Sequence, residues 1–270
     1  MRSLQQTNVL MAKEGFMEIV AILNQKGGSA KTTTAVNLGS ALAEKKQKVL
    51  LIDIDPQGSA SNWLGFKNQS KGLFTVFTEN GSISDIVSKS CVPGLDIIVS
   101  SPWLINADKA LAGEVGAETI LKKHLANISE PRWDYILIDC PPTLGIMSLN
   151  ALTAAHKVLV PLETHIMAVQ GLAQLLNTIN IVKDRLNPSL EIDGILPCRV
   201  NTRTRLSQDI ISDLRKRFDK QVYQTTIRES VKLAEAPSFG KPITLYDSKS
   251  SGAADYRSLA TEIIKRRKGK

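Results

Sequence analysis

A glycine-rich segment near the start of the chain combines residue types that bind phosphate. Its sequence is Gln25-Lys26-Gly27-Gly28-Ser29-Ala30-Lys31-Thr32-Thr33, and it lies between an apolar run and a stretch of strong helix formers. Glycines let backbone N–H groups curl around an anion, and the start of the helix adds partial positive charge. Lys31 would reach the β- and γ-phosphates of a nucleotide, and the Thr32 hydroxyl would bind Mg²⁺.

This segment departs from the ordinary phosphate-loop pattern G-x-x-x-x-G-K-[ST]. Gln25 and Ala30 stand at the two glycine positions, and Lys26 is an additional lysine at the start of the loop. A Gly-Gly pair before Lys-Thr is also compatible with a plain turn. The expected strand before it and helix after it favour the phosphate loop, because that context presents the backbone N–H groups to one ligand.

Two further segments end in carboxylates. Asp53-Ile54-Asp55-Pro56-Gln57-Gly58 and Asp139-Cys140-Pro141-Pro142 each follow a short apolar run. An aspartate in this place is either a helix cap or turn former, or a carboxylate that faces a magnesium ion. Ligands of open α/β sheets bind at the carboxyl ends of parallel strands. The three segments, in this order, therefore predict one nucleoside triphosphate site at that edge.

The alternation of apolar runs and helical stretches predicts the elements that position this site. We expect strands at 18–24, 48–53, 95–99, 134–139, 157–162, 192–200 and 222–227, and helices at 31–44, 165–186 and 205–218. Continuous apolar strands separated by helices are typical of a parallel sheet covered on both sides. We predict an α/β fold with one doubly wound, mostly parallel sheet, formed by residues 17–270. Residues 1–16 are expected to be an extension that need not be ordered.

Composition and charge restrict the partners. The chain has 270 residues, of which 43% are apolar and 22% charged, an ordinary globular balance with no run long enough to span a membrane. Residues 1–198 hold 17 basic and 18 acidic side chains, whereas residues 199–270 hold 17 basic and 8 acidic ones. A basic region at one end of the chain indicates DNA or an anionic membrane as partner, the alternative being a solvated surface.

Five segments together resemble the ParA/Soj family of partition ATPases, within a wider group that includes MinD and the nitrogenase iron protein. The resemblance covers about residues 17–265. Its segments are N-Q-K-G-G-S-A-K-T-T-T-A-V-N-L from Asn24, V-L-L-I-D-I-D-P-Q-G-S-A from Val49, Y-I-L-I-D-C-P-P from Tyr135, V-L-V-P-L-E-T-H-I-M-A-V-Q-G-L from Val158 and V-K-L-A-E-A-P-S-F-G-K-P-I from Val231. The last segment is typical of ParA-like proteins and is absent from MinD.

The resemblance implies roles for the acidic and basic residues of the site. Lys31 and Thr32 would bind the phosphates of ATP and Mg²⁺. Lys26 would be the signature lysine, reaching across a sandwich dimer to the nucleotide of the partner chain. Asp55 would position or activate the attacking water. Asp53 and Asp139 would hold the magnesium shell.

The resemblance also implies the nucleotide contacts and marks two departures from the family. The loop from Lys26 to Thr33, together with Gln57, would bind the nucleotide, and Arg228–Ser230 would line the adenine pocket. Ser230 stands where many members have asparagine, and Ala30 where most have glycine. Alanine fits this place if its φ is negative, although its methyl group comes close to the phosphates.

The family further implies an ATP-dependent DNA partition cycle. Members form homodimers on ATP, the dimer binds double-stranded DNA without sequence preference, and a ParB-type partner stimulates hydrolysis and releases it. Arg203 and Lys232 occupy positions of DNA-contacting residues. The run Lys265–Lys270 adds charge, which would alternatively stabilise a helix C-terminus. The expected location is the cytoplasm, on the nucleoid, with no membrane.

Other functions leave different signatures in the sequence. A MinD-like ATPase that cycles on membranes needs a C-terminal amphipathic helix, and here only a modest apolar stripe is present, more compatible with packing on the sheet. A metallocluster ATPase needs paired cysteines, whereas Cys140 has no obvious second partner. A tyrosine-kinase relative usually has a cluster of tyrosines in its tail, and none follows Tyr256. A binding module without turnover stays open because of Ala30.

Overall fold

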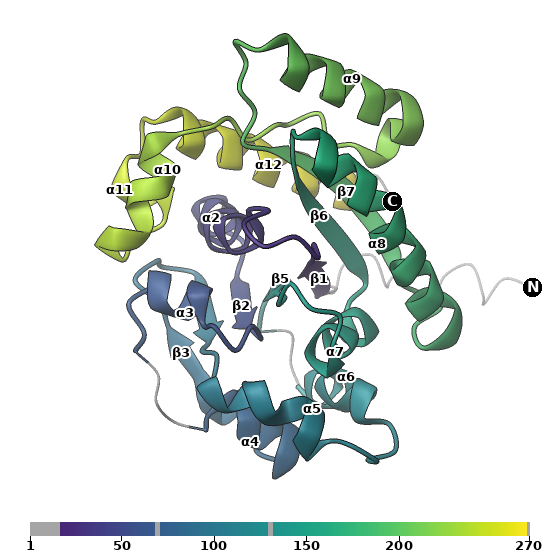
Figure 1. The fold of residues 1–270 in the computed structure, drawn as a ribbon. Coiled ribbons are helices and arrows are strands. Elements are labelled where there is room, and N and C mark those ends of the chain that lie inside the picture. Colours follow the sequence, from purple (N-terminus) through teal and green to yellow (C-terminus); the bar gives the residue numbers. More distant parts are fainter. Residues whose placement is uncertain (1–16, 68–70, 129–131, 269–270) are drawn as a thin grey trace, which may run out of the picture.

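One seven-stranded sheet runs through the computed structural model, which describes residues 17–67, 71–128 and 132–268 (Figure 1). The extension expected at residues 1–16 lies outside the described residues. In space the strands follow the order β3-β4-β2-β5-β1-β6-β7. Their bounds are β1 Glu18–Ile22, β2 Val49–Asp53, β3 Val87–Lys89, β4 Leu95–Ile98, β5 Tyr135–Asp139, β6 Lys157–Glu163 and β7 Glu191–Cys198.

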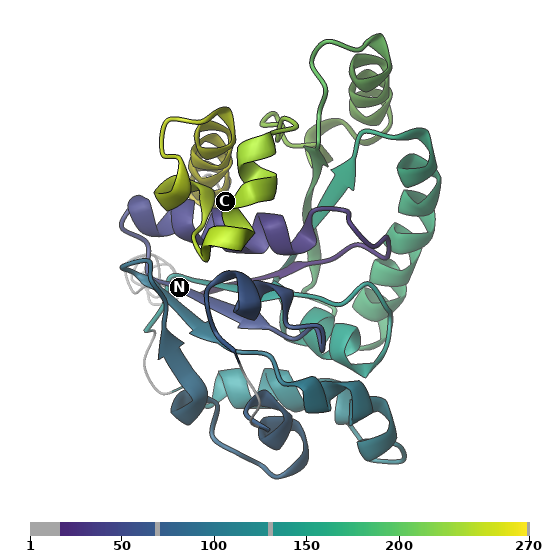
Figure 2. The same ribbon diagram turned by 60° about the vertical axis from the view of Figure 1, so that its left-hand side comes forward.

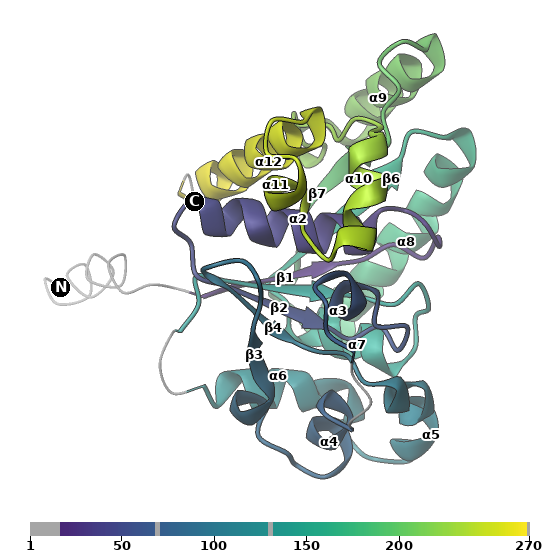
Figure 3. The ribbon, with the colours of Figure 1, turned by 90° about the vertical axis from the view of Figure 1, so that its left-hand side faces the viewer.

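Helices cover both faces of the sheet, as the buried, nearly continuous apolar strands require (Figure 3). One face packs against α2, α10, α11 and α12, and the other against α4 to α7 (Figure 2). The helices are α2 Lys31–Glu44, α3 Ser59–Trp63, α4 Leu73–Thr78, α5 Ala107–Ala110, α6 Ile120–Ala126, α7 Ile146–Ala154, α8 Ile166–Arg185, α9 Arg205–Phe218, α10 Val231–Glu235, α11 Ile243–Tyr246 and α12 Ser251–Lys268.

The parallel register gathers the predicted site at one edge. Asp53, the last residue of β2, lies opposite Asp139, the last residue of β5. On the other side of β5, Asp139 pairs with Ile22, where β1 ends and the chain continues into the phosphate loop. Parallel strands point the same way, so all three segments open at their common carboxyl edge.

Six of the seven expected strands are present, and the one expected at 222–227 is wrong. That segment forms only isolated parallel bridges, Ile195 with Val222 and Val200 with Arg228. The two bridges differ in register by one residue, and Pro197, which has no N–H to donate, lies between them. The interrupted pairing leaves this segment irregular.

The seventh strand is instead β3, a three-residue antiparallel partner of β4 at the sheet edge. A segment of this length carries no periodicity that a sequence pattern would detect. The expected helix at 31–44 has the predicted bounds, as does the helix at 205–218. In α9, Ile210 and Leu214 are buried, whereas Leu206, four residues before Ile210, is half exposed.

The C-terminal helix α12 packs on the sheet as the sequence indicated. Its apolar residues Tyr256, Leu259, Ala260 and Ile263 are buried in the core that α2 shares. This leaves no broad apolar face for insertion into lipid. Among the described residues, no helix is both long and apolar enough to cross a bilayer.

Two arginines of the basic tail contact the protein itself. Arg266 stacks over the ring of Tyr223 at 4.1 Å and donates a hydrogen bond to the carbonyl of Asp193. Arg267 lies 4.8 Å from the ring centre of Tyr135. Stacking on aromatic rings and bonding to a backbone carbonyl fix these guanidinium groups in place. Part of the C-terminal charge is therefore structural.

Candidate nucleotide-binding site

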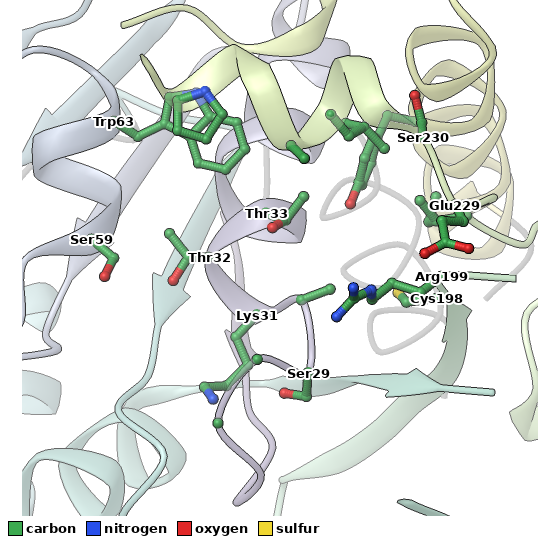
Figure 4. A pocket seen from close by; sticks show the side chains of 18 of the residues that line it. Ser29, Lys31, Thr32, Thr33, Ser59, Trp63, Cys198, Arg199, Glu229 and Ser230 are labelled. Carbon is green, nitrogen blue, oxygen red and sulfur yellow. The ribbon is translucent and has the colours of Figure 1, made fainter. Parts of the chain in front are cut away.

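A cavity of about 940 Å³ lies at the carboxyl edge of the sheet, over the phosphate loop. In Figure 4, Lys31, Thr32 and Thr33 follow the start of α2, with Trp63 on one side and Ser230 on the other. Most of the predicted nucleotide contacts line this cavity. They are Gly27, Gly28, Ser29, Ala30, Lys31, Thr32, Thr33, Gln57, Arg228 and Ser230. Asp55, predicted to position water, also lines the cavity, whereas Lys26 does not.

The phosphate loop presents unused donors and open space. No side chain caps the N-terminus of α2, so its first N–H groups are available to an anion. A Cβ added at Gly27 or Gly28 would meet no atom within 4 Å, which means that packing does not fill this cradle. The Ser29 hydroxyl is buried and has no hydrogen-bond partner among the described residues. These features fit a bound phosphate group.

Ala30 adopts a left-handed backbone conformation. Its φ is +68°, so the negative φ that the sequence reading required for an alanine here is not present. A residue with a Cβ in this region costs roughly 1–2 kcal/mol relative to the right-handed region. A glycine here would avoid this cost, so Ala30 places backbone strain at the start of α2.

Lys31 is buried beneath the loop. Its Nζ donates to the backbone carbonyl of Lys26 at 3.3 Å. Burial lowers the pKa of Lys31, while the nearby charges of Asp139 and Asp55 partly oppose this. The ammonium group therefore lies between the loop and the acidic ends of the strands, where it would neutralise phosphate charge.

Asp139 fits a magnesium shell. Its carboxylate is fully buried, and neither oxygen makes a hydrogen bond of good geometry within the described part of the chain. Burial and the neighbouring Asp53 raise the pKa of Asp139 well above its usual value, and Thr32 and Lys31 offset this only partly. A cation would satisfy both oxygens. No three acidic, histidine or cysteine side chains of the described residues form a metal cluster, so phosphate and water oxygens would complete the coordination.

Asp53 and Asp55 have partners within the protein. Asp53 accepts hydrogen bonds from the backbone N–H and the hydroxyl of Ser61, at 2.8 and 2.7 Å. Burial raises the pKa of Asp53 to about 6, although the bonds from Ser61 lower it. Asp55 lines the cavity, and one of its carboxylate oxygens accepts the N–H of Gln57 at 2.9 Å. The Asp55 side chain is thus oriented towards the nucleotide space.

Lys26 is held by an ion pair at the rim of the loop. Its Nζ lies 3.0 Å from one oxygen of Glu163, the last residue of β6, while Arg199 contacts the other oxygen at 2.9 Å. These two cations lower the pKa of Glu163 against the opposing effect of its burial. The Lys26 side chain is 45% exposed. In the single chain, Lys26 therefore points to the carboxylate of Glu163 in the same chain.

The side of the cavity that contains Arg228 is braced by α12. Arg228 donates from Nε and Nη2 to Asp255, with a shortest contact of 2.6 Å, so its guanidinium faces α12. Trp63 lines the same cavity and donates from Nε1 to the carbonyl of Lys241. Trp63 and Arg199 line the cavity but were not predicted from the sequence. Arg199 directly follows β7, and the rule that ligands bind at carboxyl strand ends was the signal for it.

The two predicted DNA contacts are exposed at the surface. Arg203 lies in the loop between β7 and α9, where its N–H donates to Asn201. Lys232 lies on α10, 3.0 Å from Glu235 and 5.9 Å from the ring centre of Tyr246. Both are cations at the surface that an external anion can reach.

This fold and loop define a P-loop ATPase with a deviant Walker A motif, in which Lys26 is an additional lysine at the start of the loop. The model for the AAA domain matches residues 17–192. The sporulation initiation inhibitor protein Soj of Bacillus subtilis is 42% identical over 91% of this chain and 98% of its own. The chromosome partitioning protein ParA of Caulobacter vibrioides is 42% identical, over 93% and 95%. The chain therefore belongs to the ParA/Soj family of chromosome-partitioning ATPases.

Solved structures agree with this assignment. A Mycobacterium smegmatis protein described as cobyrinic acid a,c-diamide synthase, with bound ADP and magnesium, superposes with a TM-score of 0.82. It is 33% identical, and the match covers 94% of this chain and 96% of that one. The class of fold expected from the sequence, a doubly wound and mostly parallel sheet, is confirmed.

Proposed function

We propose that this chain is an ATP-dependent switch for DNA partition, which dimerises on ATP and binds DNA without sequence preference. The observation that carries the proposal is the phosphate cradle. The uncapped start of α2 and Lys31 line one cavity that is large enough for a nucleotide, and the unsatisfied carboxylate of Asp139 lies at the same edge of the sheet. A ParB-type protein would stimulate hydrolysis, in the cytoplasm and on the nucleoid.

Each part of the site has a proposed task. Lys31 and the N–H groups of the loop bind the β- and γ-phosphates. Thr32 and Asp139, with Asp53 behind them, hold the magnesium shell. Magnesium, when bound, neutralises charge on the transferred phosphate. Asp55 orients the attacking water through its carboxylate, which lines the cavity.

Lys26 is the residue on which the proposed ATP-dependent dimerisation depends. The lysine is exposed at the rim, and a side chain there is free to change partners once a second chain approaches. We propose that it leaves Glu163 and contacts the nucleotide of the partner chain. Two nucleotides would then be enclosed between two identical faces, so the dimer forms only in the presence of ATP.

DNA binding is proposed at the basic surface that contains Arg203 and Lys232. Both cations are exposed and hold no buried contact that they would lose. Contacts to backbone phosphate from such groups carry no sequence information. The dimer would bring two of these surfaces together and bind duplex DNA through its charge.

A salt titration of DNA binding tests this proposal. With ATP present, affinity should fall steeply with salt and vary little with sequence, each phosphate contact adding about 0.9 to the slope of log K against log salt. Arg203→Ala or Lys232→Ala should reduce that slope by up to about 2, because the dimer carries each residue twice. Arg185→Ala, which removes an exposed charge at the end of α8, is the matched control. Affinity that does not depend on salt would disprove the mapping.

A vesicle-pelleting assay separates this function from membrane cycling. If the charged surface serves DNA, ATP-bound protein should stay in the supernatant with anionic vesicles and bind duplex DNA in parallel samples. Retention on vesicles without DNA binding would replace the proposal by a membrane-cycling one. Addition of a ParB-type protein should raise the rate of ATP hydrolysis.

A further inference from the structure

A closed ring of hydrogen bonds surrounds the main chain of Asp55. Ser100 donates from Oγ to the carbonyl of Asp55 at 2.5 Å, and its N–H donates to Oγ of Ser61 at 2.9 Å. Ser61 donates to one oxygen of Asp53 at 2.7 Å, and the other oxygen of Asp53 accepts the N–H of Asp55 at 3.3 Å. We call these four residues the serine ring.

The serine ring joins three separate elements behind the cavity. Asp53 ends β2, Ser61 lies in the short helix α3, and Ser100 follows β4 (Figure 3). All four residues are at most 8% exposed. A buried polar group without a partner is costly, so the ring keeps each of these groups in one arrangement. Both peptide groups of Asp55 are thereby fixed to the rigid sheet.

The main-chain N–H and carbonyl of Asp55 are bonded within the serine ring, so its side chain is the part that can act in the cavity. Its main chain is held on both sides by the ring, and the N–H of Gln57 orients one carboxylate oxygen. General-base and water-orienting groups need a fixed direction, because small displacements reduce their effect strongly. Ser61 and Ser100 supply that direction without themselves lining the cavity.

We propose that Ser61 and Ser100 are positioning residues for ATP hydrolysis, which act through Asp55. This proposal rests on the proposed function, in which Asp55 orients the attacking water. The two serines hold Asp55 in the geometry for hydrolysis and contribute little to ATP binding. Neither Ser61 nor Ser100 lines the cavity, so their effect is on turnover rather than on affinity.

The test compares turnover with ATP affinity in serine variants of the full-length protein. Ser100→Ala should lower kcat about 3- to 10-fold, the range expected for one neutral hydrogen bond, with the Kd for ATP within about 2-fold of wild type. Ser61→Ala should have the larger effect, because it removes two bonds of the ring. Ser100→Thr, which keeps the hydroxyl, should restore kcat. Ser40→Ala, which removes a buried hydroxyl bonded to Thr244, is the control and should leave kcat unchanged.

A double-mutant cycle with Asp55→Ala separates positioning from general weakening of the fold. If the serines act through Asp55, adding Ser100→Ala to Asp55→Ala should not lower kcat further. A further decrease of the same size in both backgrounds overturns the proposal, as does wild-type kcat in Ser100→Ala. Should Ser61→Ala not fold, Ser100→Ala and Ser100→Thr still complete the cycle.

The same experiment distinguishes failure of this proposal from failure of the proposed function. If Asp55→Ala hydrolyses ATP like wild type, the role given to Asp55 in the proposed function is wrong, and the positioning role of the serines falls with it. If Asp55→Ala is slow while both serine variants are fast, only the positioning role is overturned. If the variants weaken ATP binding as strongly as turnover, the serines are structural and the positioning role is again excluded.

Discussion

Lys31 and Lys26 lie five residues apart in the phosphate loop, yet their surroundings differ: Lys31 is buried and Lys26 is exposed. Lys31 is 7% exposed and bonds to the loop carbonyl, and burial lowers its pKa. Lys26 is 45% exposed and forms an ion pair with Glu163, which also binds Arg199. An exposed pair contributes little to stability and exchanges partners easily, whereas a buried cation stays where it is needed. We infer that Lys31 holds the phosphates of its own chain's nucleotide, whereas Lys26 changes its partner when the dimer forms.

The largest effect is expected from removing the buried lysine. Lys31→Ala should abolish ATP binding, with at least about a 100-fold rise in Kd, because no other loop side chain supplies a cation to the β- and γ-phosphates. Equilibrium binding of a fluorescent ATP analogue measures this, with thermal unfolding to verify the fold. Normal affinity in this variant would remove the phosphate-loop assignment.

Removing the exposed lysine should affect assembly and spare binding. Lys26→Gln should bind ATP within about 3-fold of wild type but remain a monomer with little turnover, since the charge would serve the nucleotide of the partner chain. Analytical ultracentrifugation with ATP gives the oligomeric state. A stable ATP-dependent dimer of Lys26→Gln would show that both lysines act within their own chain.

A smaller effect, on dimerisation, is expected from breaking the ion pair between Lys26 and Glu163. Glu163→Gln keeps the shape of the side chain and removes the charge that holds the lysine. The ATP-dependent dimer should then form at about 2- to 5-fold lower protein concentration, because an exposed ion pair is worth at most about 1 kcal/mol. Glu79→Gln, which breaks the exposed pair with Lys71, should leave dimerisation unchanged. Weaker dimerisation of Glu163→Gln would mean that Glu163 belongs to the interface itself.

The smallest effect concerns the backbone between the two lysines. Ala30→Gly should stabilise the ligand-free protein by roughly 0.5–1 kcal/mol, since relief of the left-handed strain exceeds the gain in unfolded-state entropy. Gly28→Ala, at φ +74°, should do the opposite. Urea unfolding of both variants measures the difference. A loss of stability in Ala30→Gly would show that the alanine methyl group packs more favourably than its backbone conformation costs.

Patterns along the chain were sufficient to predict most of the sheet and the position of the phosphate loop between β1 and α2. Asp53 and Asp139 were placed at the carboxyl edge because buried apolar runs end there, and the register confirms that they are neighbours. The residues that the patterns missed owe their place to contacts across the chain. Glu163 is 137 residues from Lys26, and Ser100 is 45 residues from Asp55.

The sign of φ at Ala30 was also beyond the sequence, which gave only the condition that alanine fits if φ is negative, because alanine is uncommon in the left-handed region. The basic tail shows a related difficulty. Charge counts give the net excess, but they do not separate cations that stack on tyrosine, such as Arg266, from those that are exposed, such as Lys268. Only the packing of α12 makes that distinction.

The position of α12 has a consequence for how the chain is made. Tyr256 lies beside Thr34 of α2 across 222 residues of sequence, and Arg257 binds Glu44 across 213. Until the last helix has been synthesised, one face of α2 has no cover, because that core is completed by α12. Contacts between such distant segments slow folding, since the intervening chain must be closed before they form. During translation, the part of the chain made before α12 would therefore expose an apolar face, and at this stage aggregation is favoured and a chaperone would be most useful.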